Sequence, residues 1–363
     1  LLVLDYIRAH KKCPKWRRDL KMDEHYKIEI GELVSGEENA WAQYVKKHDK
    51  GTIYHLSIWN SIIQTCFSHN VVNIVARDHS GNICGLLPLV HMKSWAFGNN
   101  MYSLPYFNYG GVLSENDEVK NKLIKYATSM ANNLGVSYLQ LREETQLESS
   151  DIPVTTNKVN MLLELPNTPE ELGKQIGSKR RSQIKRPIRE GVEHKIGGIE
   201  LLDDFYYVFC INMRDLGTPV YSKAFFEQIL TTLSDNAVLC IVYWKGEAVS
   251  AGFLLHYKER MEIPWASTLR HANKISVNMY LYWHILSYAI EQGFKQFDFG
   301  RSTIDAGTYK FKKQWGAEPQ QCFWYHWTPK GKPAPNLSPT NSKFEAAIKV
   351  WQKLPLNLTK IIG

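Results

Sequence analysis

An internal duplication restricts what this chain can fold into more than any other feature of its sequence. Residues 73–94 read as a strand, a glycine-containing turn and a second strand, and residues 239–260 repeat that order. A helix pattern closed by glycine and followed by a strand spans residues 123–142, and residues 281–301 repeat it. A pattern that recurs after about 150 residues indicates two copies of one structural unit.

The order of the elements in each copy predicts the type of sheet that it forms. A strand pair, a helix and a further strand build a mixed, mostly antiparallel sheet flanked by helices. The sequence therefore predicts an α/β (α+β) fold of two tandem units, which agrees with the domain number expected for 363 residues. We expect a basic N-terminal extension over residues 1–24, a first domain over 25–157, a second domain over 158–330, and a linker with a C-terminal amphipathic helix over 331–363. The stretch from Met22 is typical of a protein start, so residues 1–21 carry little functional weight.

The composition excludes several classes of protein. Hydrophobic residues at 44% and charged residues at 22% exclude disordered and collagen-like chains. No apolar run approaches the roughly 18 residues of a membrane span, so we expect no integral membrane segment. The six cysteines form no C-x-x-C pair and the twelve histidines no zinc-like cluster, which favours free thiols in the cytoplasm and no metal site. For the last helix two interpretations are open: it packs on the rest of the protein, or it contacts the inner face of the membrane.

The positive charge is local. The net charge is +8, and residues 8–21 and 178–195 carry a net +6 and +5 of it. For the second segment two interpretations are open. It is a solvated helix face, or Lys179, Arg180 and Arg181 hold phosphates of a nucleotide, a lipid-linked sugar or an RNA.

A predicted strand end holds the first catalytic candidates. Alternation over residues 297–302 puts Asp298 on the face opposite Phe297 and Phe299. Gly300 is expected to end the strand, and Arg301 follows. Strand ends beside glycine are where α/β enzymes place chemistry, although a structural Asp298–Arg301 pair is the alternative.

A lysine-rich stretch follows. Residues 308–316 hold three lysines, and three aromatic residues are interleaved with them: Tyr309, Phe311 and Trp315. Aromatic residues that fix a lysine loop predict a cationic site able to hold a phosphate or to stabilise an oxyanion.

Other stretches are candidates for substrate binding. Arg214 and Asp215 are adjacent at a helix end before Tyr221, which indicates either a paired cap or a substrate loop. Trp265 and Ser267 end a strand in a pattern that suits a polar ligand. Residues 173–179 resemble a phosphate loop, but the glycine spacing is one residue short and a helix precedes them.

Taken together, these motifs resemble the FemAB-like proteins, most closely the subgroup associated with exosortase/PEP-CTERM systems. The resemblance covers roughly residues 28–351 and rests on these stretches: Tyr54 and His55 with Trp59, Leu87 with Pro88, and residues 103–111, 178–181, 213–219, 265–268, 298–302 and 311–316. It implies a bacterial N-acyltransferase built from tandem GNAT-like domains.

The resemblance also implies a reaction. The better studied Fem-type enzymes move an amino acid from aminoacyl-tRNA onto an amine of a peptidoglycan precursor in the cytoplasm. The subgroup is associated with exopolysaccharide and protein-sorting loci, so an amino sugar or a lipid-linked saccharide is an alternative acceptor. No cofactor is expected to be permanently bound, and the acyl donor is a cosubstrate. Aminoacyl-tRNA and acyl-CoA both stay open, because residues 270–278 lack the glycines of a CoA-binding turn and no long helical arm is evident.

We therefore expect an acyltransferase whose acceptor lies between the two units. The F-K-x-x-[FW]-G motif of the family falls on Lys312, which would stabilise the oxyanion or the leaving group. Asp298 would take the amine proton or orient Arg301. The rivals are a non-catalytic binding module for anionic glycan or RNA, and an acyl-CoA-dependent GNAT acetyltransferase. The residues expected to bind substrates are Arg214, Asp215, Tyr221, Trp265, Ser267, Lys179, Arg180, Arg181, Gln314 and Trp315.

Overall fold

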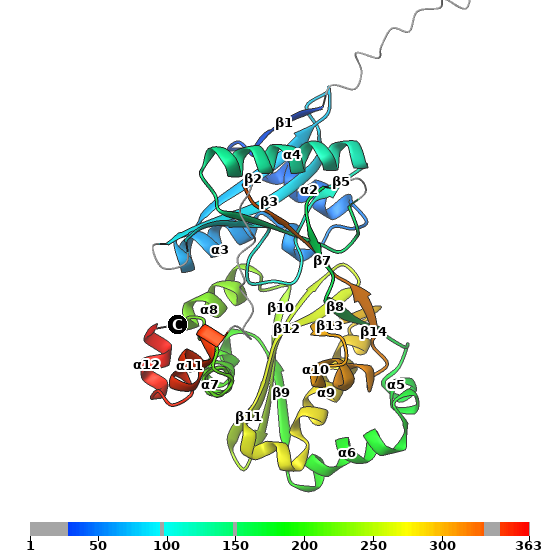
Figure 1. Cartoon of the computed structure of the whole chain (residues 1–363). Coiled ribbons are helices and arrows are strands. Elements are labelled where there is room, and N and C mark those ends of the chain that lie inside the picture. The colour runs from blue at the N-terminus through cyan, green and yellow to red at the C-terminus, as the bar shows by residue number, and fades with distance from the viewer. Residues whose placement is uncertain (1–27, 95–97, 148–150, 330–341, 363) are drawn as a thin grey trace, which may run out of the picture.

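A computed structural model describes residues 28–94, 98–147, 151–329 and 342–362 of the chain (Figure 1). It consists of two mixed sheets flanked by helices, which confirms the predicted fold class. The expected N-terminal extension over 1–24 and most of the expected linker lie outside the described residues. None of the helices within the described ranges is both long enough and apolar enough to cross a membrane.

The first sheet has eight strands within the described ranges, in the order β1-β2-β3-β4-β6-β15-β7, with β5 paired to β3. Its pairs are antiparallel except for β4 with β6. The strands are β1 (Glu29–Glu32), β2 (Asn70–Arg77), β3 (Ile83–Ser94), β4 (Gly98–Tyr102), β5 (Leu113–Ser114), β6 (Tyr138–Glu143), β7 (Val154–Thr155) and β15 (Phe323–Trp327).

Helices lie on both faces of the first sheet. The Asn116 side chain caps α4 by accepting a hydrogen bond from the Val119 N–H, and the apolar stripe of α4 packs on β2, β3 and β6. Trp41 and Val45 of α2 cover the opposite face. The helical segments of this unit are α2 (Glu38–Lys47), η2 (Ile53–His55), α3 (Ile58–Phe67) and α4 (Asp117–Asn133).

The second sheet has seven strands in the described part of the chain, in the order β14-β8-β13-β12-β11-β10-β9. Its pairs are antiparallel except for β12 with β13, which align in parallel over only three residue pairs. The strands are β8 (Lys158–Glu164), β9 (Glu193–Gly197), β10 (Ala237–Trp244), β11 (Glu247–Tyr257), β12 (Arg260–Thr268), β13 (Gln296–Thr303) and β14 (Glu318–Gln321).

The apolar spacing of Leu172, Ile176 and Ile184 predicts one helix that runs through the basic segment, but residues 169–189 form two helices. Threonine before a proline and a glutamate predicts a helix start, and Thr168 does cap the first helix by accepting a hydrogen bond from the Glu171 N–H. Gly177, at a φ of +80°, then separates α5 (Pro169–Gln175) from α6 (Gly177–Arg189). Pro187 lies within α6, and the helix ends two residues later.

The other helices sandwich the second sheet. The side chains of α9 and buried residues of α5 and α6 pack on one face, and those of α7 and α8 on the other. Of the two C-terminal helices, α11 includes the predicted amphipathic segment, whereas α12 was not predicted. Their bounds, with the remaining segments, are η3 (Ile199–Leu201), α7 (Leu202–Leu216), α8 (Lys223–Thr232), η4 (Arg270–Ile275), α9 (Val277–Glu291), α10 (Gly307–Lys313), α11 (Ser342–Trp351) and α12 (Leu356–Ile362).

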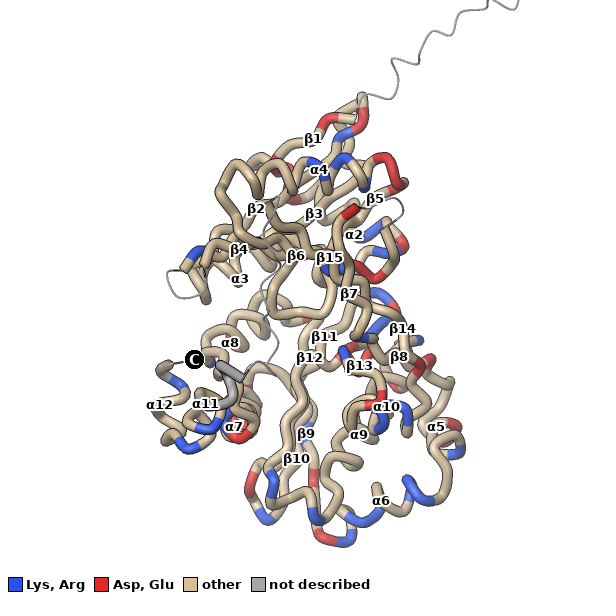
Figure 2. The backbone as a smooth tube through the Cα atoms, viewed as in Figure 1, with Lys and Arg blue, Asp and Glu red and all other residues tan. Residues whose placement is uncertain are grey.

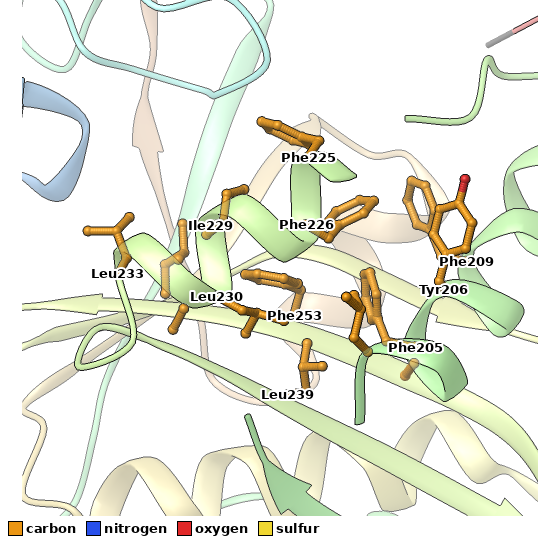
Figure 3. Packing of buried hydrophobic residues seen from close by; sticks show 14 of the residues in the cluster. Phe205, Tyr206, Phe209, Phe225, Phe226, Ile229, Leu230, Leu233, Leu239 and Phe253 are labelled. Carbon is orange, nitrogen blue, oxygen red and sulfur yellow. The ribbon is translucent and has the colours of Figure 1, made fainter. Parts of the chain in front are cut away.

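One hydrophobic core joins the two units. Phe205, Phe226 and Phe253 meet between α7, α8 and β11 (Figure 3), with ring centroids 4.9 to 5.6 Å apart. The same cluster continues through Trp265 to Phe107 of the first unit, 5.7 Å away. Aromatic pairs at these separations contribute beyond the area they bury, so the units are held against one another.

The chain also crosses between the sheets. After β14 in the second sheet, it enters the first sheet as β15, where Tyr325 pairs with Leu141 of β6. The predicted boundary at residue 330 assigns this strand to the second unit. Because β15 lies in the first sheet, its Trp324 contacts Arg301 near the end of β13.

Candidate active site between the two sheets

Two buried carboxyl groups lie where β12 and β13 separate. Glu262 and Asp298 are directly opposite one another in the last parallel pair of these strands, and they are 5% and 0% exposed. Burial raises the pKa of both groups. Because two neighbouring carboxylates in a dry site repel, the pair is expected to hold a proton.

A tyrosine from the first unit joins this pair. The hydroxyl of Tyr109 donates toward Asp298 Oδ2 at 3.0 Å and toward Glu262 Oε2 at 3.2 Å. Tyr109 is itself buried and lies at the end of the loop between β4 and β5, in which Leu104 and Tyr106 have positive φ. The loop therefore places a hydrogen-bonding group of one unit on the acid pair of the other.

Gly300 acts differently from the prediction. It does not end β13, which continues to Thr303 past a shift in register between Asp298 and Arg301. Gly300 has a φ of +73°, and its N–H donates to Asp298 Oδ1 at 2.7 Å. The irregularity thus turns the backbone back onto the carboxylate, at a φ that favours glycine.

Lys312 lies beside the acid pair. The predicted lysine loop is the short helix α10, and Lys312 is the buried one of its lysines at 7% exposure. Its Nζ donates to the carbonyls of Gly300 at 2.9 Å and Arg301 at 3.0 Å, which leaves one N–H for a ligand. Burial lowers the pKa of Lys312 to about 8, while the charge of Asp298 acts in the opposite direction.

Arg301 is not paired with Asp298, contrary to one prediction. Its guanidinium carbon lies 4.4 Å from the centroid of the Trp324 ring, and that of Arg142 lies 4.6 Å from the same ring. The hydrogen bonds to Asp298 come instead from Gly300 and Tyr109. Arg301 therefore belongs to a cationic group at the junction of the units.

A cavity of about 760 Å³ lies next to the acid pair. Glu262 and Tyr109 border it, together with Glu143, Glu144 and Arg260. Glu144 Oε1 and Arg260 Nη1 form an ion pair at 3.0 Å. Burial raises the pKa of Glu143 to about 7, against the lowering effect of the hydrogen bond from the Val112 N–H.

Gly111 allows Glu143 to adopt its position. A Cβ at residue 111 would lie 2.1 Å from Glu143 Oε1 and 2.8 Å from the Arg142 carbonyl oxygen. We predict that Gly111→Ala lowers the free energy of unfolding by about 3 kcal/mol, measured by urea denaturation. Gly307→Ala, which meets no atom within 4 Å at the start of α10, is the matched control. Equal stability of the two variants would contradict this close approach.

The predicted acceptor residues on α7, in the segment after it and on β12 make contacts of different kinds. Arg214 forms an ion pair with Asp215 at 2.9 Å, the cap that the sequence left as an alternative. Tyr221 and Trp265 pack in the shared aromatic core, with ring centroids 6.3 Å apart. The hydroxyl of Ser267 is buried and accepts a hydrogen bond from Asn212.

The basic helix lies away from the acid pair. Figure 1 places α6 at the end of the second unit remote from the first, and Figure 2 shows basic residues along it. Arg180 and Arg181 donate to the carbonyls of Ile176 and Gly173. Lys179 is exposed.

The two remaining predicted residues follow Lys312. Trp315 is 1% exposed and packs on Phe311 and Tyr282 in the core beneath β13, so it fixes α10 rather than facing a ligand. Gln314 is exposed at the end of α10.

The sequence patterns assign no site role to Tyr109, Glu262, Arg142 or Trp324, although Tyr109 and Arg142 lie within the motifs of residues 103–111 and 123–142. One usable signal was a charged residue at alternate positions of an otherwise apolar strand, as at Arg260 and Glu262. In the part of the chain that the structure describes, no group of three or more His, Cys, Asp or Glu side chains is arranged to hold a metal ion.

A protein-family model matches most of the second unit. The model of the acetyltransferase (GNAT) domain family matches residues 178–313, a stretch that holds Glu262, Asp298 and Lys312. No curated protein matches the sequence.

Solved structures share the fold over most of the chain. The crystal structure of FemX is similar with a TM-score of 0.62 at 14% identity, over 82% of this chain and 97% of that one. A tandem GNAT protein from the clavulanic acid biosynthesis pathway gives a TM-score of 0.56 at 13% identity, over 85% of this chain and 100% of that one. L-PGS from Bacillus licheniformis gives a TM-score of 0.53 at 14% identity, over 83% of this chain and 94% of that one.

These likenesses confirm the fold of two tandem GNAT-like units. The family match also confirms the prediction of an enzyme of the N-acyltransferase type, and it favours that class over a non-catalytic binding module. FemX and the tandem GNAT protein agree with the FemAB-like resemblance at the level of the fold.

Proposed function

We propose that this protein transfers an acyl or aminoacyl group onto an amine of a cell-envelope precursor, as a FemAB-like enzyme of the exosortase/PEP-CTERM-associated subgroup. The observation that carries the proposal is the buried Lys312 ammonium beside Asp298, inside the stretch that matches the GNAT domain family. The acceptor is a peptidoglycan peptide, an amino sugar or an exopolysaccharide unit, lipid-linked or free. The reaction takes place in the cytoplasm or at its membrane face.

The proposed chemistry is a direct displacement at an acyl carbon. The amine attacks the carbonyl of an activated ester or thioester, the oxyanion of the tetrahedral intermediate forms, and the alcohol or thiol leaves. The free N–H of Lys312 donates to that oxyanion or to the leaving group. Holding both reactants between the units supplies much of the rate, at best about 7 to 11 kcal/mol.

The acid pair accepts the proton that the amine loses. Asp298 is the nearer carboxyl to Lys312, and Tyr109 connects it to Glu262. Because burial raises the pKa of both carboxyl groups, each is a stronger base than an exposed carboxylate. Glu262 borders the cavity, so the proton leaves toward solvent there.

We favour an acyl-CoA donor, because the GNAT family match covers the second unit. Aminoacyl-tRNA is the alternative from the FemAB-like resemblance. Residues 270–275 form η4, and Ser276 at a φ of +65° precedes α9 where the CoA-binding turn of the family would have glycine. The two donors differ in how salt affects their binding.

The test is a titration with acetyl-CoA and with charged and uncharged tRNA over a salt series. If acyl-CoA is the donor, we expect acetyl-CoA to bind at all salt concentrations. Charged and uncharged tRNA then bind with equal affinity, and that affinity falls steeply as the salt concentration rises. Preference for charged tRNA that survives high salt would replace acyl-CoA by aminoacyl-tRNA. Absence of acyl transfer from either donor to glucosamine or to a lysine-containing peptidoglycan peptide would contradict the proposed function.

A further inference from the structure

Two arginines without an acidic partner share one indole ring at the junction of the units. Arg142 comes from β6 and Arg301 from β13, and both guanidinium carbons lie within 4.6 Å of the Trp324 ring centroid. Among the described residues neither guanidinium forms an ion pair. Like charges at this separation repel, so the arrangement has an electrostatic cost in the unliganded protein.

Arg142 is held in place by neutral groups only. Its Nε donates to Gln140 Oε1 at 2.8 Å, and its Nη1 donates to the carbonyls of Pro105 and Phe107. Burial and the charge of Arg301 lower the pKa of Arg142 to about 10. These bonds fix the guanidinium and leave its second terminal nitrogen for another acceptor.

The surrounding charge is positive. Burial lowers the pKa of Lys158 and of Lys312, and in both cases the charge of Arg301 acts in the same direction. The carboxylate whose charge raises the pKa of Lys312 is Asp298, and Asp298 already accepts hydrogen bonds from Tyr109 and Gly300. The charged groups on which Arg301 acts, Arg142, Lys158 and Lys312, are therefore all cations.

A further donor is present within the cluster. The indole Nε1 of Trp324 is buried and has no hydrogen-bond partner among the described residues. A buried N–H without a partner is uncommon in folded proteins and suggests an absent acceptor. Arg301 is exposed, so a ligand can reach the cluster from solvent.

We propose that Arg142, Trp324 and Arg301 bind a phosphoryl anion of the substrate. The charge of this anion is that of a diphosphate. Planar guanidinium groups match phosphate oxygens with paired N–H donors, and the bound anion would remove the repulsion between them. The inference rests on the proposed function, and it adds that the phosphoryl group lies next to Lys312. The group belongs to the donor, as in coenzyme A, or to a nucleotide- or lipid-linked acceptor.

The test is calorimetric titration with inorganic pyrophosphate at fixed ionic strength, with sulfate as the background anion. We expect R301Q and R142Q to bind pyrophosphate at least tenfold more weakly, W324F severalfold more weakly, and K125Q on α4 as tightly as the wild type. Because Arg301 is exposed, R301Q tests the site even where loss of the half-buried Arg142 unfolds the chain.

Three results would overturn the proposal. The wild-type protein does not bind pyrophosphate, R301Q binds it as tightly as the wild type, or removal of the charges of Lys179, Arg180 and Arg181 on α6 abolishes binding while R301Q does not. Competition then identifies the source. Displacement of pyrophosphate by coenzyme A assigns the anion to the donor, and displacement by UDP-N-acetylglucosamine assigns it to the acceptor. Displacement by neither means an adventitious ion only, which also overturns the proposal.

Failure of this proposal and failure of the proposed function are distinguishable. An inactive protein that binds pyrophosphate through Arg301 would contradict acyl transfer and leave the anion site standing. An active enzyme in which R301Q changes neither KM nor pyrophosphate affinity would contradict the anion site alone.

Discussion

Replacing Lys312 by methionine is expected to lower the rate of acyl transfer about 100-fold, the usual cost of removing one preorganised oxyanion donor. Methionine keeps the length of the side chain and removes its charge and its N–H donors. The carbonyls of Gly300 and Arg301 lose their hydrogen bonds, but the fold no longer buries an ammonium. The melting temperature is therefore expected to change little.

The measurement is a steady-state rate with saturating donor and acceptor, accompanied by a thermal melt. Lys125→Met on the outer helix α4 is the control, because that lysine is exposed and lies on the first unit. A Lys312→Met enzyme that works at the full rate would remove Lys312 from the reaction. A variant that is slow only because it is unfolded would be recognised from its melt.

The second large effect is a loss of stability with rising pH. Glu143 has a pKa raised by burial to about 7, against an ordinary value of 4.5 in the unfolded chain. Between these values the folded state retains a proton that the unfolded state releases, so the free energy of unfolding falls as pH rises. The difference corresponds to a loss on the order of 3 kcal/mol between about pH 4.5 and 7. Glu262 and Asp298, whose pKa values burial also raises, act in the same direction.

Glu143→Gln isolates this contribution. The glutamine oxygen still accepts the hydrogen bond from the Val112 N–H, and no charge forms at high pH. We expect the variant to unfold at a higher urea concentration than the wild type at pH 8 and at the same concentration at pH 4. Glu227→Gln, at an exposed position on α8, is the matched control. Parallel pH profiles for the wild type and Glu143→Gln would show that this carboxyl group is not the cause.

Local patterns predicted most of the elements. The alternation and turn signals of residues 73–90 and 238–256 correspond to the hairpins β2–β3 and β10–β11, and the cap at Thr168 begins α5 as predicted. These features depend on neighbours in the sequence. Gly177 shows the limit, because apolar spacing continues through it while its positive φ separates two helices.

Part of the candidate site could also be predicted from residues that are neighbours in the sequence. Asp298, Arg301 and Lys312 lie close together in the chain, and the structure brings all three to one place. Their partners come from the other unit. Tyr109 reaches Asp298 across 189 positions of sequence, and Trp324 reaches Arg301 because β15 crosses into the first sheet. Pairing between distant segments leaves no periodic signal in either one.

Charge in the sequence does not show how far a basic run lies from the acid pair. Lys179, Arg180 and Arg181 form the most basic internal run in the sequence, yet they lie on a helix at the outer end of the second unit. Arg142 stands in a strand with few other charges and lies within the junction. Burial and the absence of a counter-ion distinguish such a residue, and both depend on the three-dimensional arrangement.

The central claim is that acyl transfer occurs beside Lys312 and Asp298. The most direct measurement is mass spectrometry of the acceptor after reaction with acetyl-CoA or aminoacyl-tRNA, with the wild type and Lys312→Met run in parallel on glucosamine and on a lysine-containing peptidoglycan peptide. The account predicts an N-acylated product with one donor, formed about 100-fold more slowly by the variant. Product formed equally fast by both proteins, or by neither, would contradict it.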